Sequence, residues 1–265
     1  ELEFKLTKDN SDVVMQFRVS NDGMAYRYLV DADRTQDNES VSVKSEDSSF
    51  VLPDGGTIWT NSPSATYESG RYEKRAMSQV KSANASYSAP ILAEIPEANG
   101  AWVLLSEASV YNNDNPYCAS IFQTRSGSKA LQIKFGTRLI GEDDMNKHGF
   151  VGDRPHEDVK SVDFTDKFET PWRAAIIGEN LNAVTSSTLI TDLNPPAEGD
   201  FSWVVPGTSV WSWWSTASDN IDYASMFDYI DFCSNSGIEY CLVDFGWEVW
   251  DNYEEKIKGL VEYAD

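Results

Sequence analysis

The sequence is short of the residues that build disulfide frameworks, zinc sites and Ser-His-Asp catalytic sites. It contains three cysteines and two histidines in 265 residues. Cys233 and Cys241 are expected in a helix and in the strand that follows it, whereas Cys118 is far away in sequence. An odd number of cysteines without close spacing supports neither a disulfide framework nor a zinc site, so we expect three small buried side chains. His148 and His156 lie in polar stretches without a nucleophile motif, which leaves a Ser-His-Asp site unsupported.

Positive charge and long apolar runs are also scarce. Lys and Arg number 21 against 43 Asp and Glu, which gives a formal net charge of −22. An acidic surface repels phosphate groups, so nucleic acid and anionic lipid are poor partners. No apolar run approaches the roughly 20 residues that a membrane-spanning helix needs, and no dinucleotide or phosphate-loop motif is present. The charge fits a bacterial protein that is periplasmic or secreted, a protein that recruits divalent cations, or simply a well-solvated surface.

Short strands separated by turn residues dominate the first 200 residues. Apolar and polar residues alternate with a period of two, which is typical of strands with one buried face. Residues 12–31 predict two strands joined by Asn-Asp-Gly at 21–23, and residues 48–60 repeat the arrangement with Asp-Gly-Gly at 54–56. No segment before about residue 178 carries a sustained helical pattern. This many strands predict a large β-sandwich.

The pattern changes near residues 193–200, where two prolines and a glycine end the last of these strands. Residues 209–215 then predict a strand, and residues 218–237 predict a helix that ends at a glycine cap. Residues 238–245 form a nearly continuous apolar run, which is typical of a strand buried on both faces of a parallel sheet. Residues 252–265 predict a second helix.

This β-α-β-α order begins a parallel barrel or a doubly wound sheet and is too short to complete either. The chain therefore reads as two domains with a boundary near residue 204. We expect a β-sandwich domain over residues 1–204 and a truncated second domain over residues 205–265.

The ends of the two predicted parallel strands carry candidate binding residues. Ligands of βα sheets and barrels bind at the C-terminal ends of strands. The first strand ends in Trp213 and Trp214, and the second ends in Asp244, with Trp247 close behind. Indole faces stack on pyranose rings and carboxylates accept hydrogen bonds from hydroxyls, so these side chains predict a sugar pocket. The alternative is that Asp244 caps the following turn and the indoles fill the end of the barrel.

Glu107 is a second candidate site residue. It ends an apolar strand and precedes a stretch rich in Asn and Asp at residues 112–115. A hard cation such as Ca²⁺ needs several oxygen ligands, and such a stretch supplies them. The alternative is an acid at a strand edge beside an exposed turn. Residues 141–149 are also acidic, but they lack the spacing of a calcium loop and predict a solvated loop.

Several of these passages resemble glycoside hydrolase family 97. Residues 206–220, "PGTSVWSWWSTASDN", and 229–247, "YIDFCSNSGIEYCLVDFGW", are similar to the start of that family's catalytic barrel. Residues 170–196 resemble the passage that ends its N-terminal domain, and "WVLLSEASVY" around Glu107 resembles the segment that carries an N-domain glutamate. The resemblance implies a retaining or inverting α-glycosidase of the α-glucosidase or α-galactosidase type.

The resemblance also implies a mainly β fold, in which a β-sandwich is followed by the start of a barrel. Residues 1–204 would form an N-terminal β-super-sandwich like that of mutarotase-type domains, and residues 205–265 the first two β/α units of a truncated (β/α)₈ barrel. The family's active site lies at the barrel mouth, holds Ca²⁺ and receives a glutamate from the sandwich, a position that Glu107 matches. The catalytic acid and the base or nucleophile come from later strands, so this chain is predicted to carry no catalytic residue and to be inactive by itself.

The leading hypothesis is therefore the N-terminal part of a calcium-dependent α-glycosidase that acts on an oligosaccharide or glycoside. A non-catalytic carbohydrate-binding or structural β-sandwich is the first alternative, and a degenerate sugar-binding barrel is the second. The sequence is compatible with glucosidic and with galactosidic substrates. It is also compatible with retention or inversion of configuration at the anomeric carbon, and it does not specify an oligomeric state.

Overall fold

The computed structural model divides the chain into two compact units. It describes residues 2–8, 11–31, 40–63, 71–110, 120–125, 127–128, 130–139, 156–165, 167–213, 222–244 and 246–265. The first unit extends to Pro196, and the second continues from Ala197. Each unit has hydrophobic clusters of its own. The division lies in the segment where the strand pattern of the sequence ends, and the finer boundary at residue 204 stays a prediction.

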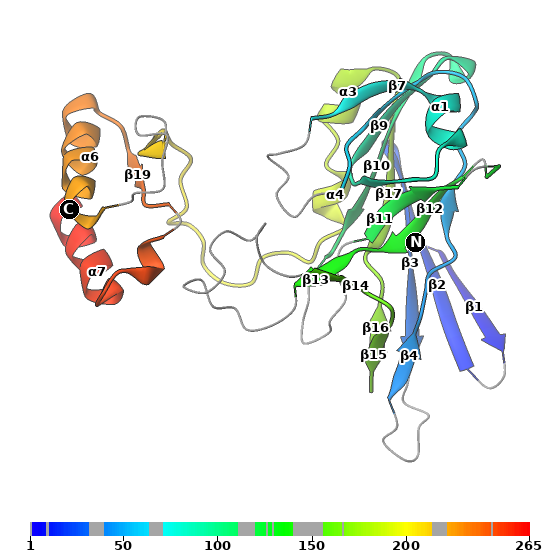
Figure 1. Ribbon diagram of the computed structural model, residues 1–265, viewed down its shortest axis with the longest axis horizontal. Coiled ribbons are helices and arrows are strands. Elements are labelled where there is room, and N and C mark those ends of the chain that lie inside the picture. The colour runs from blue at the N-terminus through cyan, green and yellow to red at the C-terminus, as the bar shows by residue number, and fades with distance from the viewer. Residues whose placement is uncertain are drawn as a thin grey trace. The chain divides into compact units, whose positions relative to one another are not determined.

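The first unit is built mainly from antiparallel strands (Figure 1), so the prediction of a mainly β fold is confirmed. Its larger sheet has nine strands in the order β1-β2-β3-β17-β10-β9-β6-β7, with β16 paired to β3. The strands are β1 (Leu2–Lys8), β2 (Ser11–Ser20), β3 (Gly23–Asp31), β6 (Thr57–Thr60), β7 (Glu73–Ala76), β9 (Ile91–Ile95), β10 (Ala101–Ala108), β16 (Lys167–Glu169) and β17 (Trp172–Gly178).

A second sheet of four strands has the order β5-β12-β11-β8, and two further strand pairs, β13-β14 and β4-β15, extend the unit. These strands are β4 (Val41–Val43), β5 (Ser49–Phe50), β8 (Ala85–Ser88), β11 (Ser120–Thr124), β12 (Leu131–Phe135), β13 (Thr137–Leu139), β14 (His156–Asp158) and β15 (Val162–Phe164).

The main core lies between the two large sheets. Every second residue of β9 and of β12 is buried, as expected for strands with one face turned inward. The resulting cluster takes side chains from both sheets, among them Ile58, Val103 and Leu105 from the larger sheet and Phe122 and Ile133 from the smaller. Burial of this apolar surface holds the sheets face to face, and the prediction of a β-sandwich is confirmed.

Two short helices pack on the opposite face of the larger sheet. They are α3 (Leu181–Thr185) and α4 (Leu189–Asp192). Asn180 caps α3, because its side chain accepts a hydrogen bond of 2.9 Å from the backbone N–H of Ala183. Val184 and Leu189 bury their side chains in a second cluster with Trp172 and Ile176. The larger sheet is therefore covered on both faces in this region.

The predicted hairpin at residues 21–23 is confirmed. Strands β2 and β3 pair in antiparallel register up to Ser20 and Gly23. Gly23 has a φ of 157°, and a Cβ added there would lie 2.2 Å from the carbonyl oxygen of Ala175. A glycine is thus required by the close approach of β17 as well as by the turn.

Asp22 ties this turn to the segment that precedes α4. Its carboxylate accepts hydrogen bonds from the hydroxyls of Ser187 and Ser20, and these bonds lower the pKa of Asp22 below 3.8. The charged form therefore stabilises the folded state above the unfolded pKa, and this contribution is lost as the pH falls through the folded pKa. We expect Asp22→Asn to be less stable than the wild type in urea at neutral pH, with the difference shrinking below pH 3.8. A difference that does not change with pH would contradict this assignment.

The second expected hairpin, at residues 54–56, is wrong. Strand β5 joins the smaller sheet and β6 joins the larger one, so the turn carries the chain from one layer to the other. Gly56 has a φ of 98°, and a Cβ there would lie 2.1 Å from the carbonyl oxygen of Glu94. Lys81, which is buried, donates to the carbonyl of Leu52 and to Asp54 at 3.0 Å. Turn residues reveal a reversal of the chain but not the sheet that the next strand joins.

One helix before residue 178 was also not expected from the sequence. Helix α1 (Met77–Ser82) follows β7 directly, and a 3₁₀ turn, η2 (Pro96–Ala98), lies between β9 and β10. Met77 and Val80 of α1 are buried in the main core. Six residues give only one such pair at helical spacing, which is too few for a periodic pattern to stand out.

The second unit contains a β-α-β arrangement followed by a helix. Its elements are β18 (Ser209–Trp211), α6 (Tyr223–Ser236), β19 (Tyr240–Leu242), the 3₁₀ turn η4 (Trp247–Val249) and α7 (Tyr253–Ala264). Strands β18 and β19 are parallel, with Ser209 opposite Tyr240. Gly237 ends α6 in the left-handed conformation, at a φ of 65°, as predicted. The expected order of elements is thus confirmed for the described residues.

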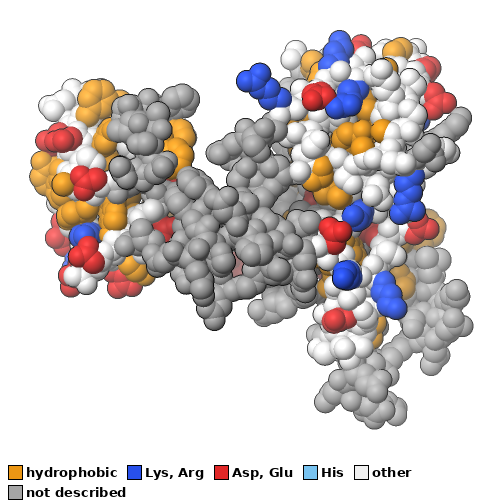
Figure 2. Space-filling model, in the orientation of Figure 1, with side chains coloured by type: hydrophobic (Ala, Val, Ile, Leu, Met, Phe, Trp, Pro, Cys, Tyr) orange, Lys and Arg blue, Asp and Glu red, His pale blue; other side chains and the backbone are white. Residues whose placement is uncertain are grey.

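Both strands are shorter than expected, and burial of β19 on both faces is wrong for this chain. Cys241 packs toward the helices, whereas Tyr240 and Leu242 are 43% and 47% exposed. The reason is that β18 and β19 pair only with each other, so one face of the pair has no covering layer among the described residues. Figure 2 shows hydrophobic side chains (orange) at the surface of this unit, which also exposes Phe232 and Val261.

The two described cysteines lie where the sequence predicted. Cys233 of α6 is buried, Cys241 of β19 is half-buried, and neither forms a disulfide. Burial raises the pKa of the Cys241 thiol to about 11, so the thiol is protonated and unreactive at neutral pH. Cys118 lies outside the described residues.

In the described part of the chain, no helix has the length and apolar character needed to cross a membrane.

Candidate functional site

The ends of the two parallel strands bring an indole and a carboxylate together. Trp211 is the last residue of β18, and Asp244 follows β19 by two residues. The indole Nε1–H of Trp211 donates a hydrogen bond of 2.6 Å to Oδ2 of Asp244. Because the strands are parallel, both groups lie at the same C-terminal edge, where βα proteins bind ligands. The carboxylate of Asp244 is thus held in one orientation.

The described tryptophans that the sequence predicts for a sugar pocket, Trp213 and Trp247, differ from each other in their contacts. The rings of Trp211 and Trp213 are stacked, with centroids 5.9 Å apart and planes 8° from parallel. Trp213 is half-buried and packs against the cluster between α6 and α7. Trp247 begins η4, and its ring meets that of Tyr253 edge to face at 5.5 Å. Trp214 lies outside the described residues.

Trp211 is a site residue that reasoning from the sequence did not select. The sequence pattern places Trp211 inside a predicted strand over residues 209–215, whereas the structure ends the strand at this position. The available signal was its place two residues before Trp213, since alternate residues of a strand point to the same side. The partner of the indole, 33 residues later, is not visible in the sequence.

Glu107 lies in the sandwich, beside a buried arginine. It is on β10, directly opposite Arg173 of β17 in the antiparallel register. The Nη1–H of Arg173 donates a hydrogen bond of 2.7 Å to Oε2 of Glu107. Residues Val103 and Leu105 of the same strand belong to the main core, so Glu107 is on the inner face of the sheet. The sequence placed Glu107 correctly near the end of a strand, but it did not reveal the arginine.

The same guanidinium binds a second carboxylate. Arg173 donates from Nε to both carboxylate oxygens of Glu46 at 3.2 Å and from Nη2 to Oε2 of Glu46 at 2.6 Å. The side chains of Arg173, Glu46 and Glu107 are 1%, 4% and 11% exposed. We call these three residues the buried triad. Charged hydrogen bonds of this kind are strong in a low-dielectric interior, and Arg–carboxylate pairs fix geometry through several bonds.

Polar and aromatic side chains surround the buried triad. Tyr26 of β3 lies opposite Arg173 in the strand register, and the hydroxyl of Ser48 donates to the hydroxyl of Tyr28 at 3.2 Å. Burial raises the pKa of Tyr26, so its phenol stays protonated at neutral pH. Along β3, Met24 packs on the main core and Val30 packs on a third cluster around Phe168. The triad therefore belongs to a polar layer between two apolar parts of the sandwich.

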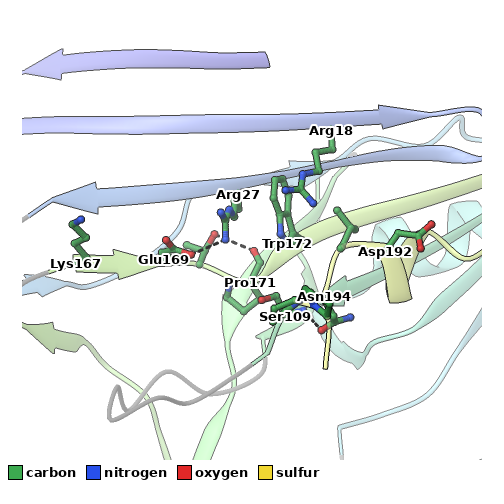
Figure 3. A pocket seen from close by; sticks show the side chains of 13 residues that line it. Arg18, Arg27, Ser109, Lys167, Glu169, Pro171, Trp172, Asp192 and Asn194 are labelled. Carbon is green, nitrogen blue, oxygen red and sulfur yellow. Dashed lines mark hydrogen bonds and ion pairs between the residues drawn. The ribbon is translucent and has the colours of Figure 1, made fainter. Parts of the chain in front are cut away.

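A cavity of about 570 Å³ opens on the other face of the larger sheet. Figure 3 shows the side chains of Arg18 and Arg27 beside Trp172, with Asn194 nearby. The two guanidinium carbons lie 4.9 and 4.6 Å from the Trp172 ring centroid. Both ends of the passage at residues 170–196, namely residues 170–172 and 192–196, line this cavity. Trp172 is only 1% exposed, so its ring supports the sheet and offers no face for stacking a sugar.

A complete metal site is not found within the described part of the chain. No group of three or more His, Cys, Asp or Glu side chains there is arranged to hold an ion. The Asn- and Asp-rich stretch after Glu107 and the acidic stretch at residues 141–149 lie outside the described residues.

Comparison with known proteins identifies the family. The model of the family described as "Glycosyl-hydrolase 97 N-terminal" matches residues 1–196, and the chain belongs to glycoside hydrolase family 97. A probable retaining alpha-galactosidase of Streptomyces bingchenggensis is 27% identical over 88% of this chain and 32% of its own length. A retaining alpha-galactosidase of Bacteroides thetaiotaomicron is 25% identical over 95% of this chain and 39% of its own length. The chain thus spans about a third to two-fifths of these curated relatives.

Solved structures share the fold. The crystal structure of a beta-arabinopyranosidase matches 99% of this chain and 40% of its own chain, with a TM-score of 0.69 and 26% identity. A glycoside hydrolase family 97 enzyme in complex with acarbose, from Pseudoalteromonas sp. strain K8, matches 99% of this chain and 39% of its own with the same TM-score. At 19% identity, the second likeness bears on the fold alone.

Proposed function

We propose that this chain is the N-terminal part of a longer, calcium-dependent α-glycosidase that hydrolyses α-galactosides or α-glucosides. The observation that carries the proposal is the Trp211–Asp244 hydrogen bond at the C-terminal edge of two parallel strands. The curated relatives support a glycosidase, since both are named retaining alpha-galactosidases. For the same reason an α-galactoside is the first substrate to test.

In this proposal, β18, α6, β19 and α7 are the first two β/α units of a (β/α)₈ barrel. The parallel pairing of β18 with β19 and the β-α-β-α order of these elements support this assignment. So does the exposure of Tyr240 and Leu242 on the uncovered face of β19, because an inner barrel face is packed with side chains once the remaining strands are present.

The proposed sugar pocket uses Trp213, Trp214, Asp244 and Trp247. Asp244 accepts hydrogen bonds from sugar hydroxyls, and the Trp211 indole keeps the carboxylate aimed along the strand edge. The other indoles contact the apolar C–H faces of the sugar ring and exclude water. These residues bind and orient. The catalytic acid and its partner carboxylate belong to later strands, as two carboxylates on either side of the scissile bond are required.

Glu107 is proposed as one calcium ligand. A carboxylate is a hard oxygen donor of the kind that Ca²⁺ binds, and Oε2 of Glu107 also accepts the 2.7 Å hydrogen bond from Arg173. At 11% exposure its side chain is the most accessible of the buried triad. The remaining ligands would come from other parts of the protein. When bound, calcium supplies a fixed positive charge that orients oxygen groups. A periplasmic or secreted location is also proposed, supported by the net charge of −22.

The test is an activity assay of the full-length protein with p-nitrophenyl α-galactoside and α-glucoside, each with and without a calcium chelator. We expect hydrolysis of at least one substrate and its loss when calcium is removed. The matched control is the 265-residue chain, which is expected to show no turnover because it carries neither catalytic carboxylate.

Hydrolysis that resists the chelator would remove the calcium part of the proposal. A folded full-length protein that hydrolyses neither substrate in the presence of calcium would favour a sugar-binding protein without catalytic activity. Turnover by the 265-residue chain would overturn the assignment of the catalytic residues to later strands.

A further inference from the structure

Two cysteine thiols meet inside the second unit. Cys233 lies in the last turn of α6 and is buried, and Cys241 is the middle residue of β19 and is half-buried. Tyr240 and Leu242 are exposed, so the side chain between them points to the opposite side of the strand, toward the helices. The thiols of Cys233 and Cys241 make a hydrogen bond with each other.

The chain between the two cysteines holds Cys233 against the start of β19. Gly237 ends α6 in the left-handed conformation and turns the chain back toward the strand. The carbonyl of Cys233 accepts a hydrogen bond of 3.0 Å from the N–H of Ile238, and its thiol donates to the carbonyl of Tyr240 at 3.2 Å. That carbonyl belongs to the peptide group that joins Tyr240 to Cys241. The sulfur of Cys233 therefore lies against the backbone from which the Cys241 side chain projects.

This arrangement meets the main requirement for a disulfide. The two sulfurs have to reach each other without movement of the backbone, and side chains that point apart cannot be joined. Here the thiols are already in contact, and both belong to elements that pack in one hydrophobic cluster. Their spacing of eight positions in the sequence gave no reason to pair them. The turn at Gly237 and the direction of β19 bring them together.

We propose that Cys233 and Cys241 form a disulfide cross-link between α6 and β19 when the chain folds in an oxidising environment. The periplasm and the extracellular space are environments of this kind, so the inference agrees with the proposed location. It does not depend on the glycosidase activity. Two S–H bonds break and one S–S bond forms, while two electrons and two protons pass to a disulfide oxidant, which leaves as two thiols.

The step takes place before the unit has closed around the two sulfurs. The thiolate is the attacking species, and burial together with the neighbouring Cys233 raises the pKa of Cys241 to about 11 in the folded state. A thiol in an unfolded chain has a pKa of about 8.5 and reacts readily. Cys233 is 7% exposed, so folding also shields its sulfur from an external oxidant. The redox state of the pair is therefore determined while the chain folds.

The experiment refolds the reduced 265-residue chain from urea in a mixture of oxidised and reduced glutathione. Remaining thiols are blocked with a maleimide, and a protease that cleaves after glutamate separates the two cysteines at Glu239. We expect mass spectrometry to find the peptide that ends at Glu239 joined to the peptide that begins at Tyr240, and reduction to separate them. Of the three thiols of the chain, only that of Cys118 is expected to be outside the cross-link.

Two variants are the matched controls. Cys118→Ala is expected to give the same joined peptides as the wild type. Cys241→Ala is expected to leave Cys233 as a thiol that the maleimide blocks. A chain that is folded by circular dichroism but has both Cys233 and Cys241 blocked would overturn the inference, and so would a bond from either one to Cys118.

A second preparation keeps the inference testable if the chain does not refold from urea. The chain is exported to the periplasm of a bacterial host, blocked with the maleimide during lysis and cleaved in the same way. The joined peptides are again the expected result, and blocked thiols at both positions in the folded chain would again overturn the inference. Neither preparation measures hydrolysis or calcium binding, so a failure here leaves the proposed function intact.

The order of folding and oxidation has its own test. The same glutathione mixture is added to the chain after it has folded in the reduced state. The cross-link is expected to form at least about tenfold more slowly than during refolding, because the thiols are then protonated and shielded. Equal rates would contradict the claim that the step precedes burial.

Discussion

Replacing Arg173 with leucine is expected to lower the free energy of unfolding by about 3–5 kcal/mol, the usual cost of breaking a buried ion pair by removing one partner. The side chain of Arg173 is 1% exposed and donates hydrogen bonds to both Glu46 and Glu107. Leucine supplies apolar volume but no donors, so two carboxylates are left in the polar layer of the sandwich without this cation. Urea unfolding of the 265-residue chain, followed by circular dichroism, measures the change.

Arg75→Leu is the matched control for this prediction. Arg75 also pairs with a glutamate, Glu73, but both side chains are well exposed, at 42% and 63%. Pairs of this kind contribute about 0–1 kcal/mol, because water and salt screen them. If the two variants lose similar amounts of unfolding free energy, the triad is solvated, and burial does not make its ion pairs stronger than an exposed pair.

Replacing Trp172 with alanine is expected to cost about 3–5 kcal/mol, the range found when a large aromatic side chain is removed from a core. Trp172 is 1% exposed and packs with Ile176 and Val184 in the cluster beneath α3 and α4. Its ring also lies under the guanidinium groups of Arg18 and Arg27, and each such contact adds to the stability. The truncation therefore leaves a cavity and removes the support of two arginines at once.

Tyr72→Ala serves as the control for this second substitution. Tyr72 is an aromatic residue of the same unit, but it is 47% exposed and its hydroxyl makes one hydrogen bond, to the carbonyl of Pro90 at 3.1 Å. Its removal is expected to cost about 1 kcal/mol or less, as is usual at the surface. Urea unfolding measures the loss of unfolding free energy in both variants. Equal losses would contradict the prediction that Trp172 stabilises the fold far more than an exposed aromatic residue does.

The features that the sequence predicted well depend on neighbouring residues. The hairpin at residues 21–23 follows from a short run of Asn, Asp and Gly, residues that favour tight turns, and the end of α6 follows from Gly237. The alternation of buried and half-buried residues in β9 and β12 is likewise a local property. The same local cues failed at residues 54–56, because a turn motif does not specify whether the next strand returns to the same sheet.

In the candidate site, too, the sequence predicted features that depend on neighbouring residues and did not predict contacts between distant ones. Glu107 and Asp244 stand out in the sequence as acids that follow apolar runs, and both lie at the ends of strands. Their partners, Arg173 and Trp211, were not selected. The ion pair joins residues 66 apart and the indole contact joins residues 33 apart, and no spacing rule connects positions so distant.

The sequence by itself determined that the chain is mainly β up to about residue 196, that a β-α-β-α segment follows, and which acids and indoles are chemically unusual. Tertiary structure alone decided that Glu46, Arg173 and Glu107 form one buried group and that the Trp172 ring is closed to ligands. The physical reason is that hydrophobic period and turn chemistry act between neighbours. Charge pairing and burial depend instead on strand register and sheet stacking, which the whole core determines together.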